Sequence, residues 1–191
     1  RIHIHKVFKG IAQRGKCSMG WFFGFKLHLI CNEKGEVLNF IITPGDVDDR
    51  KQLEYKAFVE FIYGKLVGDK AYIGKNLFQR LFVDGIQLIT KLKSNMKGAL
   101  MSVSDKLLLR KRAIIETVND ELKNIAQVEH SRHRSFENFI VNMLGAIAAY
   151  CVFPKKPCIH VQRTLDTQLA YSKFIELTLN TFRRQSVKEQ D

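Results

Sequence analysis

The chain has 191 residues, of which 46% are hydrophobic and 26% are charged, so it is long enough for one globular domain with a core and too short for two large ones. Its 31 lysine and arginine residues outnumber 19 aspartate and glutamate residues, which gives a net charge of +12. This excess favours a polyanionic partner, DNA or RNA, over a neutral metabolite, with a plain basic surface as the alternative.

The first segment, residues 1–32, is basic and contains no aspartate or glutamate. Its lysine and arginine side chains can neutralise successive phosphates of a nucleic acid strand. We therefore predict contacts to DNA or RNA from this segment, including Arg14, Lys16 and Lys26. The lack of acids also means that the segment offers no carboxylate to a metal ion.

A β-hairpin is predicted next. Residues 21–31 are mostly apolar and aromatic, with Lys26 and His28 on one parity of the segment, which is typical of a partly buried strand. A turn over 32–35 and a second apolar run over 37–43 supply the partner strand, which Pro44 ends.

Strands and helices then alternate. The expected elements are a helix over 53–62 that Asp48 or Asp49 can cap, a strand over 66–68, a helix over 77–82 and a strand over 87–92. This alternation predicts an α/β fold, in which helices pack on a mixed sheet.

The next predicted helix spans residues 104–126 and has two adjacent stripes. One stripe is apolar and should face the core; it consists of Ile115, Val118, Leu122 and Ile125. The other is polar and lies about 110° around the helix; it consists of Arg112, Glu116, Asn119 and Lys123. The carboxylate of this stripe can hold a divalent metal, while the two flanking cations contact DNA phosphates. A solvated face with an Arg112/Glu116 ion pair, worth about 0.3–0.5 kcal/mol, is the plainer interpretation.

The last helix is predicted over 136–152. Its apolar run of about 15 residues is shorter than the roughly 20 that cross a bilayer, which indicates a core helix. The four cysteines lack C-x2-C spacing and no secretory leader opens the chain, so we expect reduced thiols, a cytoplasmic protein and no membrane contact. We assign the catalytic-type domain to residues 1–153 and a polar C-terminal tail to residues 154–191.

Asp69 follows the predicted strand 66–68 directly. Carboxylates at strand ends are well placed to face a ligand crevice. Taken alone, the residue is better explained as a turn or helix-capping aspartate.

Two segments, Gly68-Asp69-Lys70-Ala71-Tyr72 and Arg112-x3-Glu116-x6-Lys123, resemble the second and third acidic motifs of bacterial insertion-sequence DDE transposases. The similarity is greatest to the IS4/IS5-like group and its IS982 branch. The segments 24–28 and 43–49 resemble the hairpin and the following turn of these enzymes. The resemblance extends from the start of the chain to about Cys158.

The resemblance implies a ribonuclease H-like fold in which three acidic residues hold two Mg²⁺ or Mn²⁺ ions, and which cuts and joins DNA. By position, Asp69 is the second acid and Glu116 the third, so both are expected to be catalytic and metal-binding. Contacts to double-stranded DNA at element ends and target are expected from Arg112, Lys123, Asn119, Lys26, Lys70, Arg14 and Lys16. A homo-oligomer on DNA and association with the nucleoid are also implied.

The chain departs from the family pattern in two places. Leu109 stands where the family has a tyrosine, three residues before the arginine. The first acid is expected on an opening strand upstream of Arg1, so the resemblance indicates an N-terminally truncated domain that lacks this strand. The alternative function is a catalytically inactive, DNA-binding remnant of a transposase.

Overall fold

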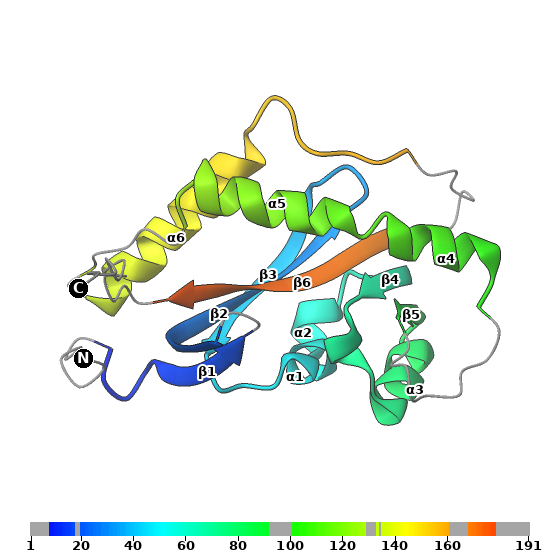
Figure 1. The fold of residues 1–191 in the computed structure, drawn as a ribbon, viewed down its shortest axis with the longest axis horizontal. Coiled ribbons are helices and arrows are strands. Elements are labelled where there is room, and N and C mark those ends of the chain that lie inside the picture. Colours follow the sequence, from blue (N-terminus) through cyan, green and yellow to red (C-terminus); the bar gives the residue numbers. More distant parts are fainter. Residues whose placement is uncertain are drawn as a thin grey trace, which may run out of the picture.

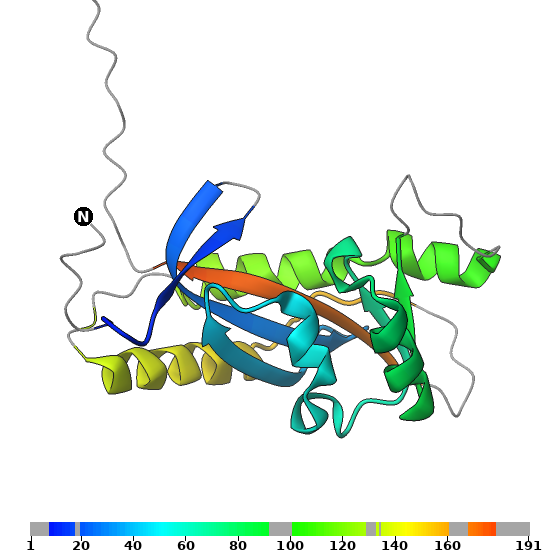
Figure 2. The same cartoon turned by 90° about the horizontal axis from the view of Figure 1, so that it is seen from below.

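The computed structural model describes residues 8–17, 20–91, 101–128, 133, 135–160 and 168–178. These residues form a mixed, six-stranded sheet that lies between two layers of helices (Figures 1 and 2). The strand order is β1-β2-β6-β4-β5, and β3 pairs with β2 outside this path. The predicted fold class, an α/β fold with a mixed sheet and flanking helices, is confirmed.

Two antiparallel pairs open the fold. Strand β2 (Gly20–Asn32) pairs with β1 (Gln13–Cys17) and with β3 (Val37–Pro44). The predicted hairpin over 21–43 is therefore confirmed. Strand β1 was not predicted, because its sequence, Gln-Arg-Gly-Lys-Cys, lacks the apolar alternation by which a half-buried strand is recognised.

Two short helices stand where one was predicted over 53–62. Helix α1 (Asp49–Glu54) begins after Asp48, whose side chain accepts a hydrogen bond from the Arg50 amide as expected of a cap. Tyr55 then has an extended backbone and separates α1 from α2 (Lys56–Val59). The extended residue interrupts the hydrogen-bond ladder, so the amphipathic run cannot form one helix.

The second half of the sheet is parallel. Strand β4 (Gly64–Gly68) is followed by a 3₁₀ turn, η2 (Lys70–Tyr72), by α3 (Lys75–Val83) and by β5 (Ile86–Thr90), which pairs with β4. These elements agree with the predicted strand, helix and strand. Because the connection passes through a helix, β4 and β5 run in the same direction and their carboxyl ends share one edge.

The helix predicted over 104–126 is divided into α4 (Val103–Arg110) and α5 (Ala113–Asn124), with Arg112 just before α5. The predicted apolar stripe is buried at Ile115, Val118 and Leu122. Ile125 is 62% exposed, so this part of the prediction is wrong. The residue lies at the C-cap of α5, beyond the turn that packs on the sheet.

Helix α6 (Phe136–Cys151) matches the predicted core helix and begins at Ser135, whose hydroxyl accepts a hydrogen bond from the Asn138 amide. Its buried residues are Phe139, Met143, Ala146, Ile147 and Tyr150. In the part of the chain that the structure describes, no helix has the length and apolar character required to span a bilayer.

Strand β6 (Leu169–Thr178) is the main difference from the sequence prediction. Residues 154–191 were expected to form a tail, whereas 169–178 occupy the centre of the sheet, antiparallel to β2 and parallel to β4. Tyr171 and Leu177 are buried. Polar residues interrupt the apolar pattern of this strand, and its ladder partners are more than 100 positions away, so local sequence did not reveal it.

The two faces of the sheet have separate cores. One core contains Val67 of β4, Tyr171 of β6 and the apolar residues of α5 and α6, and we call this side the α5 face. The other contains Leu66 of β4, Ala170 of β6 and residues of α1 to α3. Because side chains alternate along a strand, the positions two residues beyond Val67 and Tyr171 belong to the α5 face.

Candidate functional site

Asp69 is the first residue after β4 and begins the 3₁₀ turn η2. Its Oδ1 atom accepts a hydrogen bond from the Lys70 amide at 2.7 Å, so the residue caps the turn. The turn is anchored by Tyr72, which is buried beneath Gly68. The Asp69 side chain is 45% exposed, which leaves its carboxylate at the surface of the α5 face.

Arg112 connects Asp69 to Glu116. Its Nη1 atom is 2.9 Å from Asp69 Oδ1, and its Nη2 atom donates to Glu116 Oε1 at 3.2 Å. The contact to Asp69 is an ion pair without hydrogen-bond alignment. Arg112 and Glu116 are one helical turn apart, which explains their contact. The structure thus brings the two predicted carboxylates to one guanidinium, and their catalytic role remains a prediction.

Lys173 of β6 is a further member of the site that sequence reasoning missed. Its Nζ atom lies 3.4 Å from Glu116 Oε1, the same oxygen that contacts Arg112. The sequence does hold a sign of this strand. In the ten-residue segment 169–178, the apolar residues Leu169, Tyr171 and Leu177 are separated from Lys173 by even numbers of positions. That alternation indicates a strand, and only the sheet reveals which carboxylate the lysine meets.

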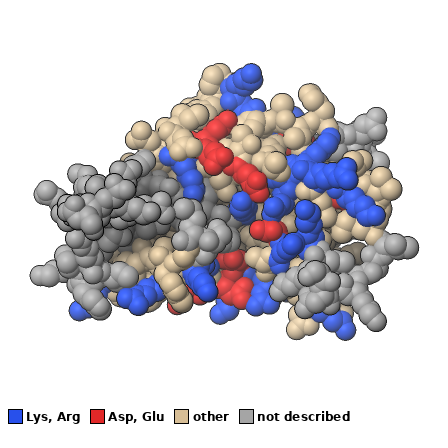
Figure 3. Space-filling view, viewed as in Figure 1, with Lys and Arg blue, Asp and Glu red and all other residues tan. Residues whose placement is uncertain are grey.

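Charges of both signs meet on this side of the molecule. In Figure 3, which has the view of Figure 1 with α5 in the upper part and α1 to α3 below, acidic side chains run from the upper part of the molecule into its centre, and basic side chains lie beside them. An acidic centre between basic flanks can bind a cation at the carboxylates while lysine and arginine side chains contact phosphates.

A family model described as the transposase DDE domain matches residues 1–136, which is more than half of the chain. The chain belongs to this family. No curated protein and no solved structure matches the chain. Membership implies a role in DNA transposition, and the mixed sheet with flanking helices is consistent with a ribonuclease H-like fold. Asp69, Arg112 and Glu116 lie inside the matched range, whereas Lys173 lies outside it.

DDE transposases normally use a divalent metal ion. Asp69 and Glu116 offer hard carboxylate oxygens, and Mg²⁺ is commonly held by one or two carboxylates plus substrate phosphate. Among the described residues, no group of three or more His, Cys, Asp or Glu side chains is close enough to hold a metal. The described residues thus offer two carboxylates to an ion and supply no third ligand of these types beside them.

Besides Arg112, four of the predicted DNA-binding residues are accessible in the transposase domain. Arg14, Lys16 and Lys70 are exposed, and Lys123 is half-buried on α5. Lys16 also lies over the ring of Trp21, with Nζ 5.9 Å from the ring centroid. Arginine and lysine side chains at such positions suit backbone phosphates.

Asn119 does not fit its predicted role in DNA binding, because it is only 6% exposed. It lies on the side of α5 that packs on the sheet, next to Val118. The predicted polar stripe is thus buried at this residue. Glu116, one turn earlier, keeps a 44% exposed side chain.

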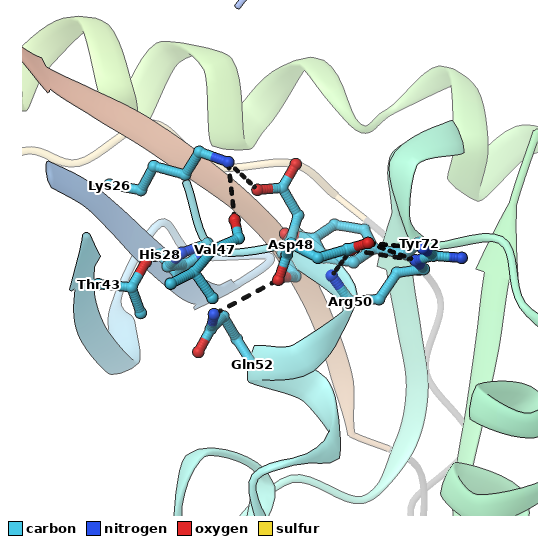
Figure 4. A network of polar contacts seen from close by, with 10 residues as sticks. Lys26, His28, Thr43, Val47, Asp48, Arg50, Gln52 and Tyr72 are labelled. Atoms are coloured by element: carbon cyan, nitrogen blue, oxygen red, sulfur yellow. Dashed lines mark hydrogen bonds and ion pairs between the residues drawn. The ribbon is translucent and has the colours of Figure 1, made fainter. Parts of the chain in front are cut away.

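Lys26 is likewise unavailable to DNA. It is 7% exposed, and its Nζ atom donates to the Val47 carbonyl and to Asp49 Oδ1, each at 2.9 Å. Figure 4 shows Lys26 directed from the sheet toward the loop before α1, with His28 beside Thr43. A phosphate contact by Lys26 is not favoured in this structure, because a buried lysine needs a paired anion and finds it in Asp49.

Proposed function

We propose that this chain is a transposase catalytic domain of the insertion-sequence type, whose reaction is metal-dependent cleavage and strand transfer of DNA. The observation that supports the proposal is the meeting of Asp69 and Glu116 at one guanidinium, within the part of the chain that matches the family. Residues far apart in the sequence are thereby gathered at the end of β4, where ligand sites in α/β sheets are common.

The two carboxylates have the proposed role of metal ligands. Mg²⁺ or Mn²⁺ bound to Asp69 and Glu116 would supply activation of the attacking oxygen and stabilisation of charge on the phosphate. Arg112, which contacts both carboxylates, would orient them and contact a phosphate oxygen when DNA binds.

DNA contacts are proposed for the accessible basic residues Lys70, Lys123, Arg14 and Lys16, and not for Lys26 and Asn119, which are buried. Lys70 is adjacent to Asp69 and is therefore the nearest of these to the carboxylates in the sequence. The partner is double-stranded DNA at element ends and target, bound by a homo-oligomer. The IS4/IS5-like group, with its IS982 branch, remains our assignment within the family.

A second function, DNA binding without cleavage, is favoured by a specific observation. The described residues supply two carboxylates and no third one, and cations contact both of them. A site in this state can bind DNA through its basic flanks without cutting it.

Both proposed functions require DNA binding, which a binding experiment tests. The affinity for a fluorescent duplex should fall steeply with salt, because each neutralised phosphate releases a counterion. Lys70→Gln should reduce the slope of log affinity against log salt by about one unit. Lys34→Gln, an equal charge change in the β2–β3 turn, is the control and should have a smaller effect. An affinity independent of salt would exclude DNA as the partner.

A cleavage experiment separates the two functions. The chain is incubated with end-labelled duplex and Mg²⁺ or Mn²⁺, alongside Glu116→Gln and Asp69→Asn. Nicking that both substitutions abolish supports the transposase reaction. Salt-dependent binding without nicking supports the non-cleaving function and overturns the catalytic proposal for this chain.

A further inference from the structure

We propose that Lys173, supplied by β6, is an internal cation that competes with divalent metal for the Asp69/Glu116 pair. This inference rests on the proposed metal role of the two carboxylates and adds a regulatory contact to it. In this state the site is neutralised by the chain's own ammonium and guanidinium groups.

The sheet register explains why this lysine reaches the site. Val67 of β4 is paired with Tyr171 of β6 in a parallel ladder. This is the last pair of the ladder, and Asp69 and Lys173 each follow it by two residues, which assigns both to the α5 face. This position of β6, from which another carboxylate could complete a metal site, thus carries an ammonium.

The contacts distribute two positive charges over two negative ones. Glu116 Oε1 is shared by Arg112 Nη2 at 3.2 Å and Lys173 Nζ at 3.4 Å, while Arg112 Nη1 lies 2.9 Å from Asp69. A metal that binds Glu116 Oε1 must displace one of these cations or accept a positive charge within contact distance. Both alternatives weaken metal binding, because like charges repel strongly at such distances.

A purely structural role for Lys173 is poorly supported by the packing. Strand β6 is held by ladders on both sides and by the buried residues Tyr171 and Leu177. The Lys173 and Glu116 side chains are 31% and 44% exposed, and ion pairs with such exposure contribute little to stability. The contact therefore matters more for the electrostatics of the carboxylates than for the attachment of the strand.

The origin of the lysine also supports a separate role. The family match ends at residue 136, and β6 begins at Leu169. Asp69, Arg112 and Glu116 thus belong to the family-matched part, and the competing cation is added by a later segment of the chain. Such an arrangement makes the metal affinity depend on the placement of β6.

The test is direct metal binding to the full chain, measured by Mn²⁺ electron paramagnetic resonance or by titration calorimetry without DNA. Lys173→Met removes the charge and keeps an apolar stem, and should tighten Mn²⁺ binding by about tenfold. Lys173→Arg keeps the charge and should bind Mn²⁺ as weakly as the natural chain. Lys173→Gln serves as a second neutral variant if Lys173→Met does not fold, as judged by circular dichroism.

Two controls make the result specific. Lys65→Met removes an equal charge from β4, where Lys65 pairs with Asp105 at 2.8 Å on the same face, and should leave Mn²⁺ affinity within about twofold of the natural value. Combining Lys173→Met with Asp69→Asn and Glu116→Gln should abolish the gained binding, which assigns it to these carboxylates.

The outcomes separate this inference from the proposed function. Equal Mn²⁺ affinity in the natural chain and Lys173→Met, with loss on Asp69→Asn and Glu116→Gln, would overturn the competing role of Lys173 and keep the metal role of the carboxylates. Binding that is insensitive to Asp69→Asn and Glu116→Gln in every background would overturn both. If Lys173→Met and Lys65→Met both raised Mn²⁺ affinity tenfold, the cause would be the change in net charge and not the contact with Glu116. That result would also overturn the proposal.

Discussion

Individual basic residues in this transposase domain are distinguished by their burial. Lys26 is enclosed with Asp49 on one side of the sheet, and burial raises the pKa of that carboxyl even though Lys26 opposes the shift. Arg112 and Lys173 lie on the opposite side and contact carboxylates that remain half exposed. The ion pair of Lys26 is thus part of the protein interior, whereas those of Arg112 and Lys173 lie at the candidate site.

His28 provides a prediction about pH. Burial, together with the nearby Lys26 charge, lowers the pKa of His28 to about 3, so the folded protein keeps the ring neutral at pH values where the unfolded chain protonates it. The unfolded state therefore binds more protons below about pH 6.5, and the free energy of unfolding should fall as pH decreases from 6.5 toward 3. The slope contributed by this residue is at most about 1.4 kcal/mol per pH unit.

Urea unfolding at pH 7, 6 and 5 checks this prediction. His28→Gln has no titrating ring and retains an amide that can bond Thr43, which contacts His28 Nε2 at 3.0 Å. The variant should lose less stability than the natural protein between pH 7 and 5. Parallel pH profiles for the two proteins would show that His28 is not protonated on unfolding in this range.

At the scale of elements, the end of β4 and the turn η2 set the position of Asp69. The turn is short, and Asp69 caps it while Tyr72 anchors it in the core on the opposite side of the sheet. Gly68 is the contact point between strand and turn. A Cβ atom there would lie 2.9 Å from Tyr72 Cδ2, too close for the ring to remain in place.

Gly68→Ala should accordingly destabilise the protein by about 1–3 kcal/mol through overpacking. Gly145→Ala is the matched control, because Gly145 lies within α6 and a Cβ atom there meets nothing within 4 Å. That substitution should stabilise the protein by about 0.5–1 kcal/mol, since alanine is the better helix residue. Urea unfolding of both variants measures the difference, and equal effects would contradict the packing argument.

At the scale of the whole molecule, β6 joins the antiparallel and parallel halves of the sheet. It lies between β2 and β4, and no direct β2–β4 ladder occurs among the described strands. Its partners are far away in sequence, so the sheet is completed only when the C-terminal part of the chain returns to the centre. Long-range pairing of this kind is expected to slow folding.

Ending the chain after residue 160 removes β6 and should abolish cooperative unfolding, because β2 and β4 lose their shared partner and the core on the α5 face loses Tyr171 and Leu177. Ending it after residue 178 retains every described contact and is the control. A peptide of residues 168–178 added to the shorter chain should restore part of the near-ultraviolet circular dichroism by strand addition. Cooperative unfolding of the shorter chain without peptide would show that β6 is dispensable.

The sequence by itself determined the local elements and the two family carboxylates. Apolar alternation revealed β2 and β3, the apolar run revealed α6, and the motifs around Asp69 and Glu116 indicated residues that the fold brings together. These helices, strands and motif residues depend on amino acids only a few positions apart or on a short family motif. Both can be recognised in a single sequence. The helix ends at Tyr55 and Lys111 were missed because amphipathic spacing continues across them, although each residue caps a helix in the structure.

Only the tertiary structure decided which charges the site contains. Lys26 and Asn119 read as DNA contacts in the sequence, and packing of the loop before α1 and of α5 removed them from the surface. Lys173 read as part of a tail, and the β4–β6 register placed it beside Glu116. Burial and strand register arise from contacts between distant segments, so no local pattern of residue types specifies them.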